Sequence, residues 1–199
     1  MILGVIPARL NSTRFPSKVI FPLKGKPIIE HVYDKALQSD LLSKVIVAVD
    51  SEETKNVINC QNIMMTSDKH QSGTDRVAEV ANNFDCDIVV NIQGDEPGID
   101  PLLIDQLITL FDDPNVEMAS IASTDLQEDD LNNDNVVKVN LDKENNAISF
   151  IRNNLNPDLT YYRHIGIYAY RKNTLNLFTS LSQSDNEKNH RLEQLRALD

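Results

Sequence analysis

The sequence predicts an α/β protein in which a mostly parallel sheet is covered by helices on both faces. Three apolar runs, at residues 2–7, 44–49 and 87–92, show no polar–apolar alternation, as expected for strands buried on both faces. A helical pattern follows each run, and repeated strand–helix units build parallel sheets. A chain of 199 residues buries about 70% of its unfolded surface, so the core needs no disulfides.

Three of the four helices predicted before residue 123 have an apolar face or an N-terminal cap. Residues 27–38 begin with Pro27, which suits a first helical turn, and place on one face Ile28, Ile29, Val32, Ala36 and Leu37. A short helix is predicted at 52–58. A further helix is capped by Ser72 or Thr74 and carries Val77, Val80 and Ala81. The last of this group, residues 101–111, turns inward Leu103, Leu107, Ile108 and Phe111. Two more strands are expected, at 63–66 and 116–122.

The pattern changes after residue 122. Residues 125–135 are acidic and polar, which indicates a surface turn or a short helix. Strands are expected at 136–141, 147–151 and 164–171, and we expect them to be partly antiparallel. A C-terminal helix is predicted at 186–198, with Leu192, Leu195 and Leu198 near one face.

Composition excludes several classes of protein. The net charge of −11 argues against a general nucleic-acid surface, and no apolar run approaches the 18 residues of a membrane span. The N-terminal residues have no basic segment ahead of their apolar stretch, so we expect a cytoplasmic protein. Cys60 and Cys86 have no metal-site spacing, and we expect two buried free thiols.

A cluster of cations follows the first predicted strand. Residues 1–26 hold five basic side chains and no acid, whereas the rest of the chain carries a net charge of −16. Three of the five lie in the segment PARLNSTRFPSK: Arg9, Arg14 and Lys18. Ligands of α/β sheets bind beyond the carboxyl ends of the strands, where arginine forks and a mobile lysine suit a triphosphate. The alternative is a solvated basic loop without function.

Two further motifs are candidates for chemistry, and the first of them lies where the same crevice is expected. The segment NIQGDEP at 91–97 follows a buried strand, and Asp95 and Glu96 offer the carboxylate oxygens that Mg²⁺ prefers. Gly94 allows a close approach of the chain there. The segment DKHQSGTDR at 68–76 opens a helix, whose first N–H groups can meet an anion or a base carbonyl. An ordinary surface turn and a simple capping segment are the alternatives.

Together with RHIGIYAYR at 163–171 and LEQLR at 192–196, these segments resemble the CMP-Kdo synthetase (3-deoxy-manno-octulosonate cytidylyltransferase) family, in order and over nearly the whole chain. The resemblance implies a Rossmann-like, glycosyltransferase-A-like nucleotidyltransferase fold and a cytoplasmic homodimer that acts without nucleic acid or membrane. It also implies transfer of CMP from CTP to Kdo with Mg²⁺, for lipopolysaccharide synthesis. We expect a single domain at 1–199, with a sugar-binding and dimerisation subregion at 123–171. The family's domain continues beyond residue 199, where it holds a second metal-binding aspartate.

The resemblance also implies the site residues. Catalysis is expected from Arg9, Arg14, Lys18 and Asp95, with Asp95 as the metal ligand. The nucleotide-binding residues are Ala8, Gln71, Ser72, Gly73 and Arg76, and those that line the sugar-acid pocket are Gln93, Arg152, His164, Tyr168, Glu193 and Gln194. From the residues alone, His164 and Tyr168 are also typical of packed core side chains, and Glu193 and Gln194 of a solvated helix face.

Other functions remain open at this stage. The same transfer to 8-amino-Kdo, a sialic acid or a pseudaminic acid would use the same nucleotide motifs. A nucleotide-binding protein without turnover would keep the cationic loop, and a purely structural partner protein would have no affinity for CTP.

Overall fold

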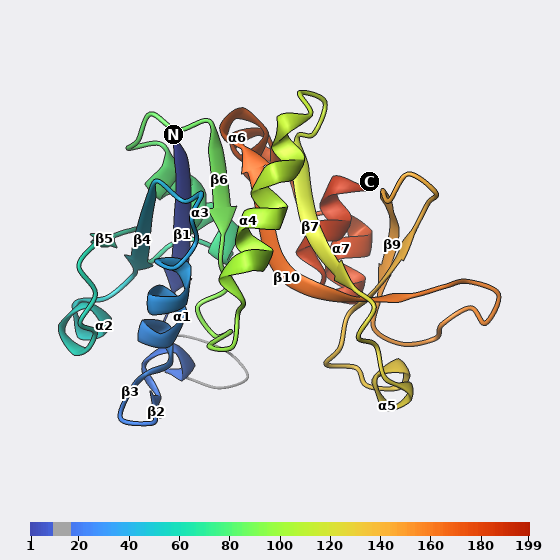
Figure 1. The fold of residues 1–199 in the computed structure, drawn as a ribbon, viewed down its shortest axis with the longest axis horizontal. Coiled ribbons are helices and arrows are strands. Elements are labelled where there is room, and N and C mark those ends of the chain that lie inside the picture. Colours follow the sequence, from blue (N-terminus) through green and yellow to red (C-terminus); the bar gives the residue numbers. More distant parts are fainter. Residues whose placement is uncertain (10–16) are drawn as a thin grey trace. The chain divides into compact units, whose positions relative to one another are not determined.

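Four parallel strands stand at the centre of the protein's first compact unit. The computed structural model describes residues 1–9 and 17–199, which form two such units. The first unit comprises Met1–Ala119 and Ile167–Thr179, and the second comprises Ser120–Gly166 and Ser180–Asp199. In the first unit the strand order is β5 (Ile63–Met65), β4 (Lys44–Val49), β1 (Ile2–Ala8) and β6 (Ile88–Asn91), all parallel (Figure 1).

Strand β10 (Tyr162–Arg171) adds an antiparallel neighbour. Its last four residues pair with β6, in the register Tyr168 opposite Asn91. Strand β7 (Met118–Ser123) also pairs with β10. The result is a mixed, mostly parallel sheet, which confirms the predicted fold class.

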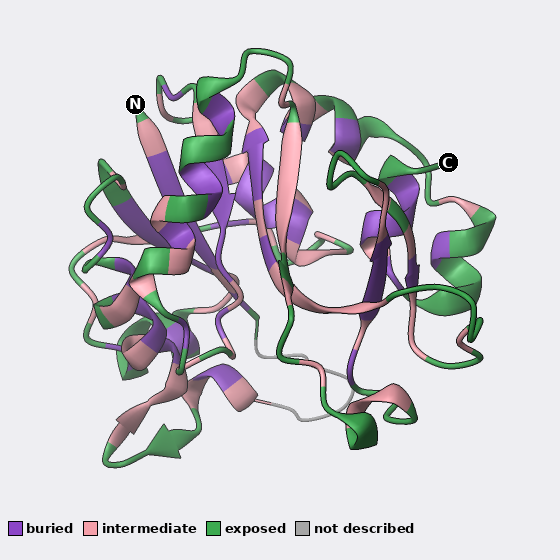
Figure 2. Ribbon diagram, turned by 45° about the vertical axis from the view of Figure 1, so that its right-hand side comes forward, coloured by how far each residue is buried: buried purple, intermediate pink, exposed green. Residues whose placement is uncertain are grey.

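Helices cover both faces of this sheet. Helices α1 (Ile28–Ala36) and α4 (Pro101–Thr109) pack on one face, against β1 and β6, and α3 (Gly73–Ala81) packs on the other (Figure 1). The face under α3 is an apolar cluster that includes Leu3, Val5 and Ile46 from the strands and Val77 from the helix. Figure 2 shows the parallel strands β1, β4 and β6 mostly buried and the outer sides of the helices exposed, as expected for strands without a polar face.

The second unit is an antiparallel sheet with short helices. Strand β8 (Lys138–Leu141) pairs with β9 (Ala147–Ile151) and with the first residues of β10. Val139 and Phe150 of this sheet form a small apolar cluster with Leu192 and Leu195. The acidic segment at 125–135 contains one helical turn, α5 (Glu128–Leu131). Helix α7 is Asp185–His190.

Several elements differ from their prediction. The prediction of one continuous helix at 186–198 is wrong. Arg191 takes the left-handed conformation (φ 53°) and separates α7 from the 3₁₀ turn Glu193–Ala197. The sequence pattern also missed α6 (Lys172–Ser180) and the two-residue hairpin of β2 (Pro22–Leu23) and β3 (Lys26–Pro27). The other short elements are α2 (Glu52–Val57) and the 3₁₀ turns Lys18–Ile20 and Leu110–Asp112.

Some side chains also lie elsewhere than predicted. Helix α4 buries Ile104 fully, whereas Leu103 is only half-buried. Leu37, expected on the apolar face of α1, is 51% exposed, because the helix ends one residue earlier. Both cysteines are free as predicted, but only Cys86 is buried. In the described part of the chain, no helix has the length and apolarity needed to cross a membrane.

Candidate active site

Lys18 and Asp95 meet beyond the carboxyl ends of β1 and β6. Lys18 begins a 3₁₀ turn, and the residue before it, Ser17, takes a left-handed conformation (φ 59°). The Nζ atom of Lys18 lies 2.7 Å from Oδ2 of Asp95, and each side chain is about 40% exposed. The cation and the carboxylate predicted to share a crevice are therefore direct neighbours, and solvent reaches both of them.

Gly94 explains how the loop that carries Asp95 comes so close to β1. A Cβ atom at this position would lie 2.9 Å from the carbonyl oxygen of Pro7 and 3.4 Å from Ile6. Cβ atoms in proteins essentially never lie as close as 2.9 Å to such an atom, so only glycine fits at position 94 without a shift of the backbone. The close approach expected from the sequence is confirmed, and it brings the acidic loop against the end of β1.

The other residues of the cationic segment are placed only in part. Ala8, the last residue of β1, is fully buried. Arg9 follows it and is exposed. Arg14 lies outside the described residues. Within the described part of this segment, the cation that contacts Asp95 is Lys18.

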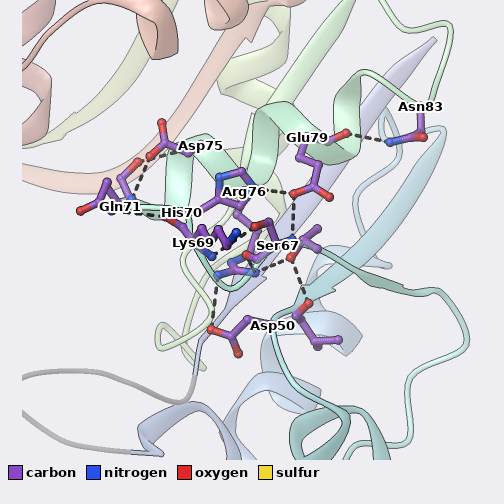
Figure 3. Close-up of polar contacts among 12 residues, drawn as sticks. Asp50, Ser67, Lys69, His70, Gln71, Asp75, Arg76, Glu79 and Asn83 are labelled. Atoms are coloured by element: carbon purple, nitrogen blue, oxygen red, sulfur yellow. Dashed lines mark hydrogen bonds and ion pairs between the residues drawn. The ribbon is translucent and has the colours of Figure 1, made fainter.

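The segment 71–73 is held at the start of α3 by a reciprocal cap. Ser72 Oγ accepts a hydrogen bond from Asp75 N at 3.1 Å, and Ser72 N donates to Asp75 Oδ2 at 2.9 Å (Figure 3). The cap is thus Ser72, one of the two candidates from the sequence. Gly73 faces Pro7, and a Cβ here would lie 3.4 Å from its Cγ. Gln71 stays exposed, and its amide donates to Lys69 O at 3.2 Å.

Arg76 points into the protein. Its side chain is only 2% exposed, and it donates through Nη2 to Asp50 Oδ2 at 3.3 Å and through Nη1 to Ser67 O at 3.2 Å and to Thr66 Oγ1 (Figure 3). Burial lowers the pKa of Arg76, and the neighbouring Asp50 opposes that shift. The guanidinium therefore ties the residue after β4 and the segment before 71–73 to helix α3.

Glu79, one turn further along α3 than Arg76, also binds the segment before residues 71–73. One oxygen, Oε2, accepts from Ser67 N at 2.9 Å and contacts His70 Nε2 (Figure 3). Burial acts to raise the pKa of Glu79, but the hydrogen bonds from Ser67 and His70 outweigh it and keep this pKa below its usual value. Ser67 is therefore held at its N–H by Glu79 and at its carbonyl by Arg76.

Sequence reasoning missed Glu79 and His70. The available signal was the spacing of Arg76 and Glu79, because residues three apart lie on the same side of a helix. Nothing in the sequence indicated that this side faces the segment 66–70.

Two residues predicted to line the sugar pocket lie in the first unit. Gln93 is half-buried in the loop after β6. Tyr168 lies on β10 beside Asn91 of β6, and its ring stacks with Tyr170 at 6.3 Å between centroids. Tyr168 is also partly buried against the apolar cluster under α3.

The other four lie in the second unit. The guanidinium of Arg152, just after β9, donates to Asp134 O at 2.9 Å. His164 Nε2 lies 2.8 Å from Ser120 Oγ, and its ring meets Phe150 edge to face at 4.9 Å. Burial lowers the pKa of His164 to about 4. Glu193 lies 3.8 Å from Arg196, and Gln194 is 6% exposed, so the helix-face alternative does not describe Gln194.

The carboxylate of Asp95 is suited to a magnesium ion that a phosphate ligand would share. No group of three His, Cys, Asp or Glu side chains among the described residues forms a complete metal cage. Mg²⁺ is usually bound by one or two carboxylates, with substrate phosphates and water in the remaining positions. The exposed carboxylate of Asp95, next to a cation, is suited to that kind of site.

Comparisons with known proteins identify the family of the chain. A family model described as cytidylyltransferase matches residues 3–199. The 3-deoxy-manno-octulosonate cytidylyltransferase of Pelobacter propionicus is 40% identical to this chain, over 100% of this chain and 85% of its own length. The enzyme of the same name from Koribacter versatilis is 41% identical, over 99% of this chain and 78% of its own length. A solved structure of CMP:2-keto-3-deoxy-manno-octonic acid synthetase complexed with CTP is 35% identical, with a TM-score of 0.90 over 99% of this chain and 85% of its own. The chain therefore belongs to the 3-deoxy-manno-octulosonate cytidylyltransferase family, as its motifs predicted.

Proposed function

We propose that this protein transfers CMP from CTP to 3-deoxy-D-manno-octulosonate (Kdo), releasing pyrophosphate and supplying CMP-Kdo for lipopolysaccharide synthesis. Its relatives carry the name of this activity. The observation that carries the proposal is the pair of Lys18 and Asp95 at the carboxyl edge of the parallel strands. A cation for the phosphates and a carboxylate for their metal ion stand side by side there.

The reaction is an in-line displacement at the α-phosphorus of CTP. The anomeric hydroxyl oxygen of Kdo forms the new bond to phosphorus, the bond to the β-phosphate oxygen breaks, and the hydroxyl proton passes to solvent. Lys18 neutralises charge that develops on the α-phosphate, and Arg9 and Arg14 bind the remaining phosphates. Positioning and electrostatic stabilisation dominate phosphoryl transfers of this kind.

Asp95 is the residue that would hold Mg²⁺. When bound, the ion supplies positive charge to the phosphate oxygens. Asp95 also forms an ion pair with Lys18.

The segment 71–73 binds the cytidine side of CTP, together with the backbone of Ala8. The cap formed by Ser72 and Asp75 keeps the start of α3 in one conformation before CTP arrives. Arg76 acts on this segment indirectly, because its guanidinium is directed to Asp50, Thr66 and Ser67. Its part is to hold the binding segment in place.

Arg152 is the residue suited to the carboxylate of the sugar acid, because its planar guanidinium can form a charge-assisted fork with it. His164 is neutral near pH 7 because burial keeps its pKa at about 4, so it serves as a hydrogen-bonding group for sugar hydroxyls. The remaining sugar-binding residues are Gln93, Tyr168, Glu193 and Gln194. The enzyme acts in the cytoplasm as a homodimer, with the subregion 123–171 at the dimer contact.

Pyrophosphate release tests the proposal. The protein is incubated with CTP and Mg²⁺ and, separately, with Kdo, 8-amino-Kdo, a sialic acid and a pseudaminic acid. We expect release with Kdo at the highest kcat/KM, and little release when UTP replaces CTP. A preference for another acid would reassign the substrate. CTP binding by calorimetry without release on any acid would instead establish a nucleotide-binding protein, and no CTP binding would refute the nucleotide site.

A further inference from the structure

Lys138 is a lysine with no exposed surface. It lies on β8 of the second unit, and its side chain is among the largest that are fully buried. Lysine is rarely buried completely unless its ammonium group is satisfied by partners. Burial accordingly lowers the pKa of Lys138. The substrate chemistry above does not use this residue, so its position calls for another explanation.

Two backbone carbonyl oxygens accept hydrogen bonds from the ammonium group of Lys138. Lys138 Nζ donates to Arg152 O at 2.5 Å and to Asn133 O at 2.9 Å. The ammonium group therefore joins the end of β9 to the turn that precedes β8.

The same two segments meet a second time through Arg152 itself. Its Nη1 donates to Asp134 O at 2.9 Å, and the neighbouring Asn153 donates to Asp134 Oδ1 at 3.2 Å. Lys138 thus holds the backbone on both sides of this contact, at residue 133 and at residue 152. The direction of the Arg152 guanidinium depends on where these two backbone segments lie.

The charged groups that face Lys138 form a small set. Asp134 and Asp130 act to raise its pKa, and Arg152 acts to lower it. Arg163, which is opposite Lys138 on β10, is engaged with Asp130 at 3.2 Å. The acids of this turn thus lie close enough to Lys138 and the two arginines to offset part of their positive charge.

We propose that Lys138 is a positioning residue for Arg152: it fixes the guanidinium in the direction in which it meets the carboxylate of the sugar acid. This rests on the proposed function, because it assumes that Arg152 binds that carboxylate. A guanidinium that is already oriented loses little conformational freedom on binding, and so binds its ligand more tightly.

The test replaces Lys138 by methionine, which keeps a long apolar side chain but removes the donors. Without the ammonium group two buried carbonyls lose their partner and the two segments relax. We expect KM for the sugar acid to rise about tenfold or more. The affinity for CTP alone, measured by calorimetry, should stay within about twofold because the nucleotide segments belong to the first unit. Lys143→Met, an exposed lysine in the turn of the same hairpin, is the matched control and should leave both values unchanged.

A double-variant cycle separates positioning from general damage. If Lys138 acts through Arg152, Lys138→Met should add little to the effect of Arg152→Ala on KM for the sugar acid. Fully additive effects, or an unchanged KM in Lys138→Met, would overturn the proposal. Should Lys138→Met not fold, Lys138→Gln keeps one donor group and should show a smaller rise in KM, and an unchanged KM there would be equally decisive. A wild type active on none of the four acids would overturn the proposed function and this role together, whereas an active wild type isolates the role of Lys138.

Discussion

The ammonium group of Lys18 lies 2.7 Å from a carboxylate oxygen of Asp95, although 77 positions separate the two residues in the chain. One follows β1 and the other follows β6, and these strands are parallel neighbours. Adjacent parallel strands present their carboxyl ends at the same edge of a sheet, and this places the two loops together.

Lys18→Ala and Asp95→Ala should each reduce kcat at least about a hundredfold, because each removes a charge that acts at the phosphates. Neither should change the free energy of unfolding by more than about 1 kcal/mol, since an ion pair this exposed contributes little. Steady-state pyrophosphate release and urea unfolding measure the two quantities. Lys55→Ala, which removes an exposed ion pair on α2, is the control and should keep full activity. Near-normal turnover in either variant would contradict the proposed chemistry.

Glu79→Ala should raise KM for CTP several-fold and leave KM for the sugar acid unchanged. The substitution removes the acceptor of Ser67 N and of His70, and so loosens the segment that leads to Gln71 and Ser72. Initial rates at varied CTP and varied sugar acid separate the two effects. Glu53→Ala on helix α2 removes the same charge from an exposed position and should behave as the wild type. An equal change in both KM values would speak against a local role.

Arg76→Met should lower the free energy of unfolding by about 3 kcal/mol, because it leaves the carboxylate of Asp50 without its cation. Urea unfolding measures this loss. The double variant Arg76→Met/Asp50→Asn should be more stable than Arg76→Met alone, since the uncompensated charge is then gone. If the second substitution makes the protein less stable, burial of the Asp50 charge is not the source of the loss.

His164 should make the protein less stable as the pH falls from 7 to 5. Burial keeps the pKa of His164 at about 4 in the folded protein, whereas an unfolded histidine titrates near 6.5. Between these values the unfolded chain takes up a proton that the folded protein does not, so stability falls by about 2 kcal/mol at pH 5. Urea unfolding at pH 7 and pH 5 measures the fall in the free energy of unfolding. The contribution of His164 to that fall should be present in the wild type and absent in His164→Gln. His190→Gln, at an exposed position, should keep the wild-type difference.

The sequence predicts the polar contacts of the site whose partners are close together in the chain, but not those whose partners are far apart. The cap of α3 is such a local contact, because Ser72 and Asp75 have the spacing that a capping box requires. The contacts of Glu79 with Ser67 and His70 span nine to twelve positions and have no helical or strand period. They exist because the segment before α3 turns back along the helix.

The C-terminal segment shows the same limit. Its leucines favoured one helix, yet Arg191 breaks it, and Arg196 reaches back to Glu187 with Nε at 2.7 Å and Nη2 at 2.6 Å from the two carboxylate oxygens. Both side chains are nearly fully buried. Helix α6 was missed for a related reason: its asparagines and threonines are weak helix formers, and Leu175 and Phe178 are buried by packing within the fold.

By itself, the sequence determined the alternation of strands and helices, the edge of the sheet at which charged loops gather, and the family. These follow from local signals: apolar runs, caps, and motifs that the chain carries whole. Only the tertiary structure decided which charges are buried and what each one holds. In the sequence, Arg76 and Lys138 look like any exposed base, but both are buried. Arg76 pairs with Asp50 and the carbonyl of Ser67, and Lys138 donates to the carbonyls of Asn133 and Arg152. Burial and pairing depend on distances across the fold, which residue spacing along the chain does not encode.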